Sequence, residues 1–552
     1  MAKASKKSAS PAPQDVLLRL DAPGMTPLHR AGLGGLAATL RYADVKRRQI
    51  EEDEEDMPEI LAPLLTPEFT WNVESKSIRL NFGSPDNAGR FFEALSKFAF
   101  QIQDGAIYLP GQYRIDQPPH PSRRRMLQKG MTLTFLQHGK TRNLGEEETA
   151  TYEYKGHSVE YRFKPCSSYV HQDKWKEWID SKGRLTSKPC SFQGPFYPGA
   201  VVRHIAFAGA TGAAQSVGLS IALTFALVGT VSYQARGGLG VLVIPQVDDL
   251  RSFAQRRNLI TPYEVQDTFI ASLSDAVLRF ALNEIGGKVE TSLSSQSSGG
   301  SCEGVCFRTV PWSTQQKSRC ETQTLKSPST QMINAYSVAL RHFKPRMISQ
   351  EIELKEGKGK AAAVSKKTEY FWKDSVFRSF VADNLVQDKY WFEGFTQFSK
   401  KLDFSGKNTM WTLLRYEKKE LNEMVNDEKL DWKLDGAKTL VLAVQEALRN
   451  LYGKASSSAP SKAAIGNRLD SEYEKWRIAF AGAKTPEQFR NSFADMLSRA
   501  KTNSQMADDW HTVVKLILED WSLARDLALL ALASYKGSKS DEGQEQDSDV
   551  DD

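Results

Sequence analysis

The chain has 552 residues, of which 40% are hydrophobic and 25% are charged. This length is sufficient for more than one domain with a sizeable core. Its five cysteines, an odd and low number, do not suit a disulfide-stabilised secreted protein and predict a reduced, cytoplasmic one.

The net charge of +6 conceals an asymmetry along the chain. Residues 541–552 (DEGQEQDSDVDD) carry seven acidic side chains and no basic one. Removing these seven from the 67 acidic residues leaves 60 against 73 basic ones, a net charge of +13 for residues 1–540. A basic body of this kind favours a polyanionic partner.

The N-terminal region contains a glycine-rich stretch. Residues 1–13 are basic and polar without the apolar core of a signal peptide, and we predict a disordered arm. The letters GLGGLA at 32–37 fit the dinucleotide-binding pattern, but the expected strand at 16–20 is separated from them by Pro23 and Pro27. We therefore expect a helix that packs closely through small residues, and a nucleotide-dependent enzyme using Gly32–Ala37 is the less favoured alternative.

Residues 14–354 are expected to form an α+β body of short strands and helices. The expected strands are Val16–Leu20, Phe69–Val73, Ser77–Leu80, Ala106–Leu109, Met131–Phe135, Thr149–Tyr154, His157–Phe163 and a central strand, Leu239–Pro245. The expected helices are Gly34–Gln49, Asn87–Ile102, Lys174–Ile179, Pro262–Ile285 and Gln331–Phe343. The uncharged segment Ile205–Gln234 is rich in small residues, so we expect a buried helix and strand and no membrane contact.

Three later segments define the domain organisation. Residues 292–317 are rich in Ser, Gly and Gln and are expected to form a long polar loop. Residues 355–367 (KEGKGKAAAVSKK) are expected to be a basic linker, followed by an all-α helical bundle over 368–535, in which Pro486 after Thr485 marks a helix start. We predict that the acidic tail, 536–552, is disordered.

The sequence carries no recognisable catalytic or cofactor motif. It has no H-E-x-x-H, P-loop or G-x-S-x-G pattern, and its eight histidines are scattered. Cys302, Cys306 and Cys320 resemble a fragment of a zinc site but lack a second close pair, so free thiols are the preferred interpretation. We expect no catalytic residue, no metal and no cofactor.

Clusters of basic residues indicate contact with a nucleic-acid backbone, although each cluster also suits a solvated surface. In the body, aromatic residues alternate with some of these bases, a pattern that suits base stacking. The candidates are Arg123, Arg124, Arg125, Lys129, Lys174, Lys176, Arg256 and Arg257 in the body, and Lys400, Lys401, Lys407, Arg415, Lys418 and Lys419 in the bundle.

Three features together resemble a known family. They are LDAPGMTPLHRAGLGGLAATLR at 20–41, VLVIPQVDDLRSF at 241–253 and the terminal helical bundle. The chain resembles the large subunit of type I CRISPR Cascade complexes, in particular those of I-B-like, myxobacterial-type systems. The resemblance covers most of the chain, and its C-terminal bundle resembles the small subunit of these complexes, which some relatives make from an internal start; Met410 and Met424 are candidates here.

The resemblance implies a non-catalytic protein at the 5′ end of a crRNA. Its expected partners are the crRNA, target double-stranded DNA, the backbone and 5′-handle-binding subunits, and a helicase-nuclease. Such a subunit reads a short PAM in the duplex and helps to open the target, while guide pairing supplies sequence specificity. A free-standing nucleic-acid-binding protein is the alternative.

Amide and basic side chains can read base edges in the grooves of the duplex. Two glycine-containing segments offer both types of side chain and are candidates for PAM reading, although a flexible connector and a strand turn explain them equally well. Their candidate residues are Gly299, Gly300, Gln315, Gln316, Lys317 and Arg319 in one segment, and Gln234 and Arg236 in the other.

Overall fold

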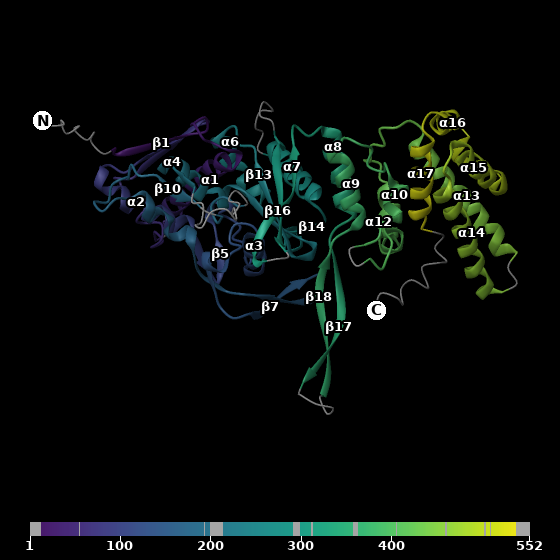
Figure 1. Ribbon diagram of the computed structural model, residues 1–552, viewed down its shortest axis with the longest axis horizontal. Coiled ribbons are helices and arrows are strands. Elements are labelled where there is room, and N and C mark those ends of the chain that lie inside the picture. Colours follow the sequence, from purple (N-terminus) through teal and green to yellow (C-terminus); the bar gives the residue numbers. More distant parts are fainter. Residues whose placement is uncertain are drawn as a thin grey trace. The chain divides into compact units, whose positions relative to one another are not determined.

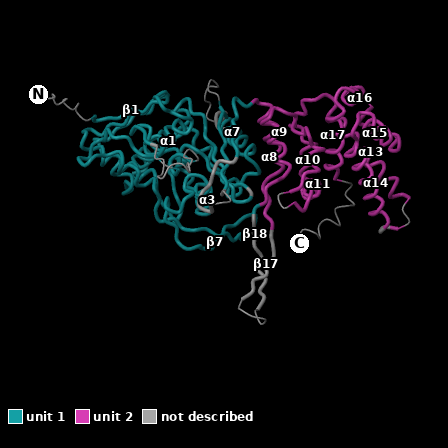
Figure 2. The backbone as a smooth tube through the Cα atoms, viewed as in Figure 1, with its two compact units in different colours: residues 1–328, 368–372 teal, residues 329–367, 373–552 magenta. Residues whose placement is uncertain are grey.

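The chain folds into two compact units. The computed structural model describes residues 13–54, 56–192, 194–198, 213–290, 299–310, 313–356, 363–403, 406–458, 461–501, 504–507 and 509–536. Unit 1 comprises residues 1–328 and 368–372, and unit 2 comprises residues 329–367 and 373–552 (Figure 2). Unit 1 combines sheets with helices, whereas the C-terminal part of unit 2 is a succession of helices (Figure 1), which confirms the predicted fold class.

The predicted domain limits stay predictions. Of the expected linker, residues 355–356 end strand β17 (Arg346–Glu356) and residues 363–367 begin strand β18 (Ala363–Lys373), while 357–362 lie outside the described residues. Residues 1–12 of the expected arm and 537–552 of the expected tail also lie outside them.

A three-stranded antiparallel sheet begins unit 1. Strand β3 (Ser77–Asn81) lies between β1 (Asp15–Arg19) and β2 (Thr70–Val73). Its alternate residues Ile78 and Leu80 are buried, as expected for a strand with one face in the core. Helix α2 (Ala88–Ala99) follows and buries Phe91 and Phe92 against Phe82, and the hairpin β4 (Gln101–Gln103) and β5 (Ala106–Tyr108) comes next.

Helix α1 (Pro27–Asp53) explains the glycine-rich stretch. A Cβ atom at Gly32 would lie 1.8 Å from the backbone oxygen of Ala222, in helix α4 (Val217–Thr224). A Cβ at Gly35 would lie 2.4 Å from the oxygen of Phe225, immediately before helix α5 (Ala226–Gly229). The prediction of close packing through small residues is therefore confirmed. Because Gly32 and Gly35 lie inside a helix and not in a strand-to-helix turn, their backbone N–H groups bond within the helix and do not face a phosphate.

The centre of unit 1 is a five-stranded sheet in the order β14-β12-β13-β15-β16. Only β12 and β14 pair in parallel; the other neighbours are antiparallel. Strand β13 is buried from Gly240 to Pro245, which confirms the expected central strand. Gly130 of α3 approaches the sheet at Ser232, and Gly304 of β15 approaches α7 at Val277, so both helices pack on the sheet. The bounds are α3 (Pro121–Leu133), β12 (Val231–Ala235), β13 (Leu239–Pro245), α6 (Leu250–Arg256), β14 (Phe269–Ile270), α7 (Leu273–Glu290), β15 (Cys302–Val310) and β16 (Ser313–Leu325).

Smaller elements complete unit 1. Three two-stranded sheets and a 3-10 helix, η4, occupy the region between α3 and α4. Their bounds are β6 (Arg142–Leu144) with β9 (Cys166–Tyr169), β7 (Glu148–Tyr154) with β8 (His157–Phe163), β10 (Cys190–Phe192) with β11 (Ala213–Gln215), and η4 (Val170–Trp178).

Several expected elements of unit 1 are wrong, among them the strand at 131–135 and the polar loop at 292–317. Residues 131–133, expected in a strand, end helix α3, because the apolar run at 131–135 is too short to distinguish the two structures by its pattern. Residues 302–310 and 313–317, expected in a polar loop, belong to β15 and β16, where pairing with β13 and within the hairpin overrides the local composition. The uncharged segment contributes α4, α5 and β12, and no helix of the described residues is long and apolar enough to cross a membrane.

Unit 2 contains the helical bundle. Helix α17 lies at its centre, with Leu527 to Leu532 buried, against α13, α14 and α10. The helix start predicted at Pro486 is confirmed, because the Thr485 hydroxyl accepts the backbone N–H of Gln488 at 3.2 Å. The bounds are α8 (Thr330–His342), α9 (Val376–Val386), α10 (Phe395–Lys400), α11 (Met410–Leu414), α12 (Lys418–Val425), α13 (Ala437–Ser457), α14 (Lys462–Gly482), α15 (Pro486–Ala500), α16 (Trp510–Glu519) and α17 (Trp521–Ala533).

Candidate nucleic-acid interface

The three consecutive arginines of helix α3 point into unit 1. Arg123 is 9% exposed, and its Nε donates to the Pro262 carbonyl oxygen at 2.6 Å. Arg124 is also buried and forms an ion pair with Asp104. Arg125 is half-buried, with its guanidinium 4.1 Å from the Phe163 ring centre. All three cations therefore already have partners inside unit 1.

Arg123 is part of a column of stacked groups. The rings of Tyr108 and Tyr113 are stacked at 5.3 Å with an interplanar angle of 3°. The Arg123 guanidinium lies 5.4 Å from the Tyr113 ring centre and 5.2 Å from that of Tyr263. Burial lowers the pKa of Arg123. It raises the pKa of Tyr113 to about 12, so Tyr113 is a neutral phenol at neutral pH. The column ends at Tyr263, which is 60% exposed.

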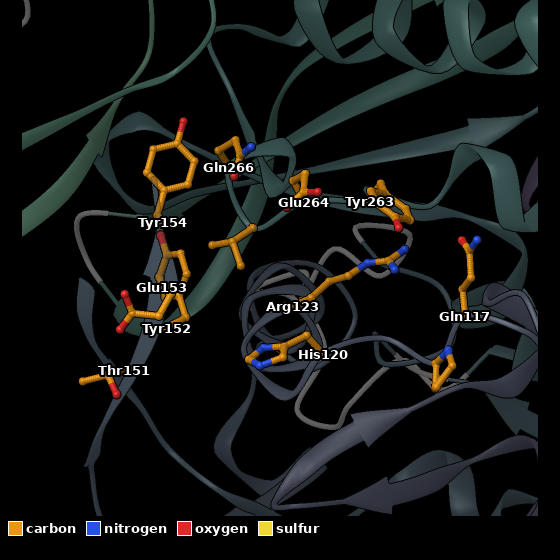
Figure 3. Close-up of a pocket in the computed structure, with 12 residues that line it drawn as sticks. Gln117, His120, Arg123, Thr151, Tyr152, Glu153, Tyr154, Tyr263, Glu264 and Gln266 are labelled. Atoms are coloured by element: carbon orange, nitrogen blue, oxygen red, sulfur yellow. The ribbon is translucent and has the colours of Figure 1, made fainter. Parts of the chain in front are cut away.

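Beside the end of this column lies an open pocket of about 510 Å³ (Figure 3). In Figure 3 the Arg123 side chain extends toward Tyr263, while Thr151, Glu153 and Tyr154 come from strand β7 on another side. The lining residues are Gln117, Pro118, His120, Arg123, Thr151, Tyr152, Glu153, Tyr154, Tyr263, Glu264, Val265 and Gln266. A concave surface with aromatic faces and a few polar groups is typical of a ligand site.

The 3-10 helix η4 carries two of the predicted cations. Lys174 is buried, and its Nζ lies 2.7 Å from an oxygen of Glu177 and 2.5 Å from the Ser191 carbonyl oxygen. Lys176 is exposed and forms an ion pair with Asp173 at 2.7 Å. Of the predicted body cations outside η4, Lys129 is exposed at the end of α3.

Arg256, Arg257 and Gln234 are held inside the protein. Arg257 donates to the carbonyl oxygens of Val228 and Thr230 at 2.6 Å each, and burial lowers its pKa to about 9. Arg256 lies 3.4 Å from the Glu284 carboxylate, and the Gln234 amide donates to the Met126 carbonyl oxygen at 2.9 Å. These three groups connect elements of unit 1 in its interior.

The PAM candidates lie in the β12–β13 hairpin, in strand β16 and in the turn that precedes β15. Gly300 has φ +84°, the left-handed region that favours glycine, and its N–H donates to Glu284 at 2.7 Å. Gly299 precedes it in the same turn. Arg236 begins the turn between β12 and β13. The side chains of Arg236, Gln315, Gln316, Lys317 and Arg319 lie outside the described residues, and the last four belong to strand β16.

The bundle cations are placed differently from those of unit 1. They lie between the end of α10 and the start of α12, and Lys400 donates to the Ala481 carbonyl oxygen at 2.7 Å. Lys401 and Arg415 are exposed and form no ion pair within the described part of unit 2. The exposed members are Lys400, Lys401, Lys407, Arg415 and Lys419, whereas Lys418 is half-buried.

The cysteines of the suspected zinc fragment lie in the central sheet. Cys302 and Cys306 are buried in β15, and the Cys302 thiol donates to the Val277 carbonyl oxygen at 3.8 Å. The Cys320 side chain lies outside the described residues. Among the described residues, no three His, Cys, Asp or Glu side chains are grouped to hold a metal ion.

Comparison with known proteins identifies the family. A family model described as the DevT N-terminal domain matches residues 17–224, and one described as the DevT C-terminal domain matches residues 427–552. The chain is also similar to "CRISPR-associated protein Cas8a1/Csx13" of Myxococcus xanthus (strain DK1622), with 33% identity over 567 residues, covering 100% of this chain and 93% of the relative. The chain belongs to the Cas8a1/Csx13 family.

Membership of the Cas8a1/Csx13 family confirms the resemblance to a CRISPR large subunit that the sequence motifs indicated. The first motif, at 20–41, lies within the DevT N-terminal match. The two DevT matches do not include residues 225–426, where Tyr263 and the exposed bundle cations are found.

The sequence patterns did not identify Tyr263 as a candidate. We expected residues 262–285 to form one helix, whereas α7 begins at Leu273 and Tyr263 lies in the irregular segment before it. The residues around Tyr263 contain no stacking motif that sequence reasoning recognises. The other members of the column, Tyr108, Tyr113 and Arg123, come from a much earlier region of the chain. The run of arginines that contains Arg123 was the one sequence feature that pointed to any part of the column.

Proposed function

We propose that this protein is the non-catalytic large subunit of an RNA-guided Cascade complex that targets DNA. The similarity to a Cas8a1/Csx13 protein along the full chain carries this proposal. The subunit binds at the crRNA 5′ end beside the backbone and 5′-handle-binding subunits, reads the PAM in duplex DNA and helps to open the target. It then recruits the helicase-nuclease.

The distribution of exposed cations supports a role in binding polyanions. Because guide pairing supplies sequence specificity, the protein needs only a short duplex-reading element and positive surfaces along the backbone. Exposed cations of unit 2, such as Lys401 and Arg415, have the chemistry for phosphate contact. In unit 1, Lys129 and Lys176 offer the same chemistry at the surface.

Isolation of the intact complex tests the proposal. The chain would be co-expressed with the neighbouring genes of its operon and a CRISPR array, purified through a tag, and the associated RNA sequenced. We expect one guide RNA of constant length that carries repeat-derived ends. Purified complex without such RNA, while the tagged chain is abundant and folded, would contradict the proposed function.

The PAM-reading part requires its own experiment. The complex would be bound to duplexes that share one guide-matched target and differ in the flanking bases, with Arg236→Ala and Lys317→Ala variants compared with wild type. Loss of one reading side chain should relax discrimination between flanks, because a good bidentate contact to a base contributes about 1–3 kcal/mol of discrimination. Equal discrimination by wild type and both variants would exclude these two residues as readers.

A further inference from the structure

The stacked column in unit 1 is incomplete at its outer end. Tyr108, Tyr113, Arg123 and Tyr263 follow one another at separations of 5.2 to 5.4 Å. Tyr108, Tyr113 and Arg123 each have two such neighbours, because Arg124 also lies 5.9 Å from the Tyr108 ring centre. Tyr263 has Arg123 on one side, is 60% exposed and borders the open pocket. The column therefore ends in an aromatic ring with a surface still accessible for stacking.

The Tyr263 ring is supported before any ligand arrives. The residue that precedes it, Pro262, is buried, and its carbonyl oxygen accepts the Arg123 Nε at 2.6 Å. Arg123 is itself 9% exposed, so both its hydrogen bond and its stacking contacts hold the segment in place. A ring that is already positioned loses little conformational freedom when a planar ligand stacks on it.

The polar groups of the pocket indicate what kind of planar ligand fits. Arg123 is the only lysine or arginine among the lining residues, and it is already engaged in the column. Glu153 and Glu264 are exposed carboxylates that would repel a phosphate but accept hydrogen bonds from ring N–H or amino groups. The amides of Gln117 and Gln266 offer both donors and acceptors. This set of groups suits the edge of a nucleobase better than a phosphate.

We propose that an unpaired nucleobase stacks on Tyr263 and places its polar edge in this pocket. The inference rests on the proposed function, since it assigns one base-binding position to a protein proposed to bind nucleic acid. Aromatic rings bind bases of single-stranded RNA and DNA by the same stacking chemistry. The base comes from an unpaired stretch of guide RNA or from a single strand of the opened DNA, and binding to RNA and DNA oligonucleotides separates the two.

The test uses the purified full chain and oligonucleotides that carry one 2-aminopurine among pyrimidines, as single-stranded RNA and as single-stranded DNA. Stacking on Tyr263 should quench the 2-aminopurine emission. The Tyr263→Ala variant should lose the quenching and bind roughly five- to a hundredfold more weakly, the range expected for one stacked base. The Tyr263→Phe variant keeps the ring and should retain both properties. The oligonucleotide type that shows the larger effect identifies the strand.

A matched control comes from unit 2. Trp510 is 56% exposed at the start of α16, and Trp510→Ala removes an aromatic surface of comparable exposure without touching the column. This variant should bind and quench as wild type does. Because Tyr263 is largely exposed, its truncation should leave the unfolding midpoint nearly unchanged. A second measurement does not depend on any variant: the wild-type chain is cross-linked to 5-iodouracil oligonucleotides with ultraviolet light, and the cross-linked peptides are mapped.

Equal quenching and affinity for wild type and Tyr263→Ala would overturn the inference, as would cross-links that never include the peptide containing Tyr263. A wild-type chain that binds neither oligonucleotide would overturn it as well. The proposed function is judged separately, by the guide RNA that purifies with the complex, so its failure and the failure of the base-stacking site give different results.

Discussion

Burial divides the basic residues of this protein into two groups with different roles. Arg257 is 1% exposed and makes three hydrogen bonds, to the Val228 and Thr230 carbonyl oxygens and to the Thr261 hydroxyl at 2.7 Å. Lys129, by contrast, is exposed at the surface of unit 1. A charge can be kept in the interior only when its hydrogen-bonding capacity is satisfied there, so Arg257 is a structural cation.

Substitution separates these two roles. We expect Arg257→Met to lower the free energy of unfolding by about 3 kcal/mol or more, because carbonyl oxygens that accept from Arg257 would be left buried without donors. Lys129→Met should change it by no more than about 0.5 kcal/mol. Urea unfolding followed by tryptophan fluorescence measures both. A small effect for Arg257→Met would show that its hydrogen bonds contribute little to unit 1.

His171 is a buried residue whose stability contribution depends on pH. It is fully buried among Phe100, Tyr169 and Phe196, and neither ring nitrogen has a hydrogen-bond partner within the described residues. Burial, with a smaller contribution from the charge of Lys174, lowers its pKa to about 3. An unfolded histidine binds a proton near pH 6.5, so the folded state is favoured fully above that pH and loses stability as the pH falls toward 3.

We expect His171 alone to lower the stability of the protein by about 2 kcal/mol at pH 5 relative to pH 7.5. The His171→Leu variant should remove that part of the pH dependence, whatever its own stability at pH 7.5. The urea midpoints of both proteins at the two pH values test this. His511→Leu, at an exposed position, is the control and should keep the wild-type pH dependence; an unchanged dependence in His171→Leu would contradict the assignment.

At the scale of elements, helix α1 shows how small residues determine a helix pair. Gly32 and Gly35 lie one turn apart and allow the backbones of α4 and α5 to approach α1 closely. Gly229 of α5 takes part from the other side, because a Cβ there would lie 1.8 Å from the Ala31 oxygen. The same glycine pattern in a strand-to-helix turn would have indicated a nucleotide site. Its position inside a helix is what distinguishes a close helix contact from a nucleotide-binding turn.

A single methyl group should disrupt this contact. We expect Gly32→Ala to destabilise unit 1 by about 3 kcal/mol, at the upper end of the usual overpacking cost, because its Cβ meets a backbone oxygen that cannot rotate away. Gly453→Ala in α13 is a matched control, since nothing lies within 4 Å of its Cβ position and alanine favours a helix by about 0.5–1 kcal/mol. The midpoints of thermal and of urea unfolding should therefore both fall for Gly32→Ala and both rise for Gly453→Ala. A neutral Gly32→Ala would contradict the close packing of α1.

At the scale of the whole molecule, the basic excess of residues 1–540 can attract a polyanion mainly through those cations that are exposed. In unit 1, several predicted cations have internal partners, as Arg123, Arg124 and Lys174 do. In unit 2, five of the six predicted cations are exposed. Contact with a nucleic-acid backbone is therefore expected to depend more on the bundle cations than on the arginine run of α3.

Neutralising the exposed bundle cations should weaken binding of nucleic acid without changing its sequence preference. A variant with glutamine at 400, 401, 407, 415 and 419 should bind more weakly, and the slope of log affinity against log salt should decrease by about 0.7–0.9 for each phosphate that the variant no longer neutralises. Binding of the purified complex at several salt concentrations measures the slope. Arg90→Gln with Lys97→Gln is the control, since both cations are exposed but paired with Glu68 and Glu93. Equal slopes for all proteins would exclude the bundle surface as a phosphate-binding site.

The sequence by itself determined the types of most elements, the fold class and the family. Helix and strand periodicities are local, so β13, the helix start at Pro486 and the close-packed helix over the glycines could be predicted from a few neighbouring residues. The family resemblance rested on two continuous motifs and the helical bundle. The prediction for residues 302–317 was wrong because strand pairing with β13, a non-local interaction, overrides a polar composition.

Only the tertiary structure decided which charged and aromatic side chains remain available to a ligand. Arg123 is buried by its contacts with Pro262 and Tyr263, which lie 139 and 140 positions away in the chain. The pattern RRR at 123–125 is the same whether its side chains face solvent or the interior. Burial depends on what the rest of the chain brings to each side chain. For the column that ends at Tyr263, those neighbours come from β5, the segment after β5 that contains Tyr113, α3 and the segment before α7.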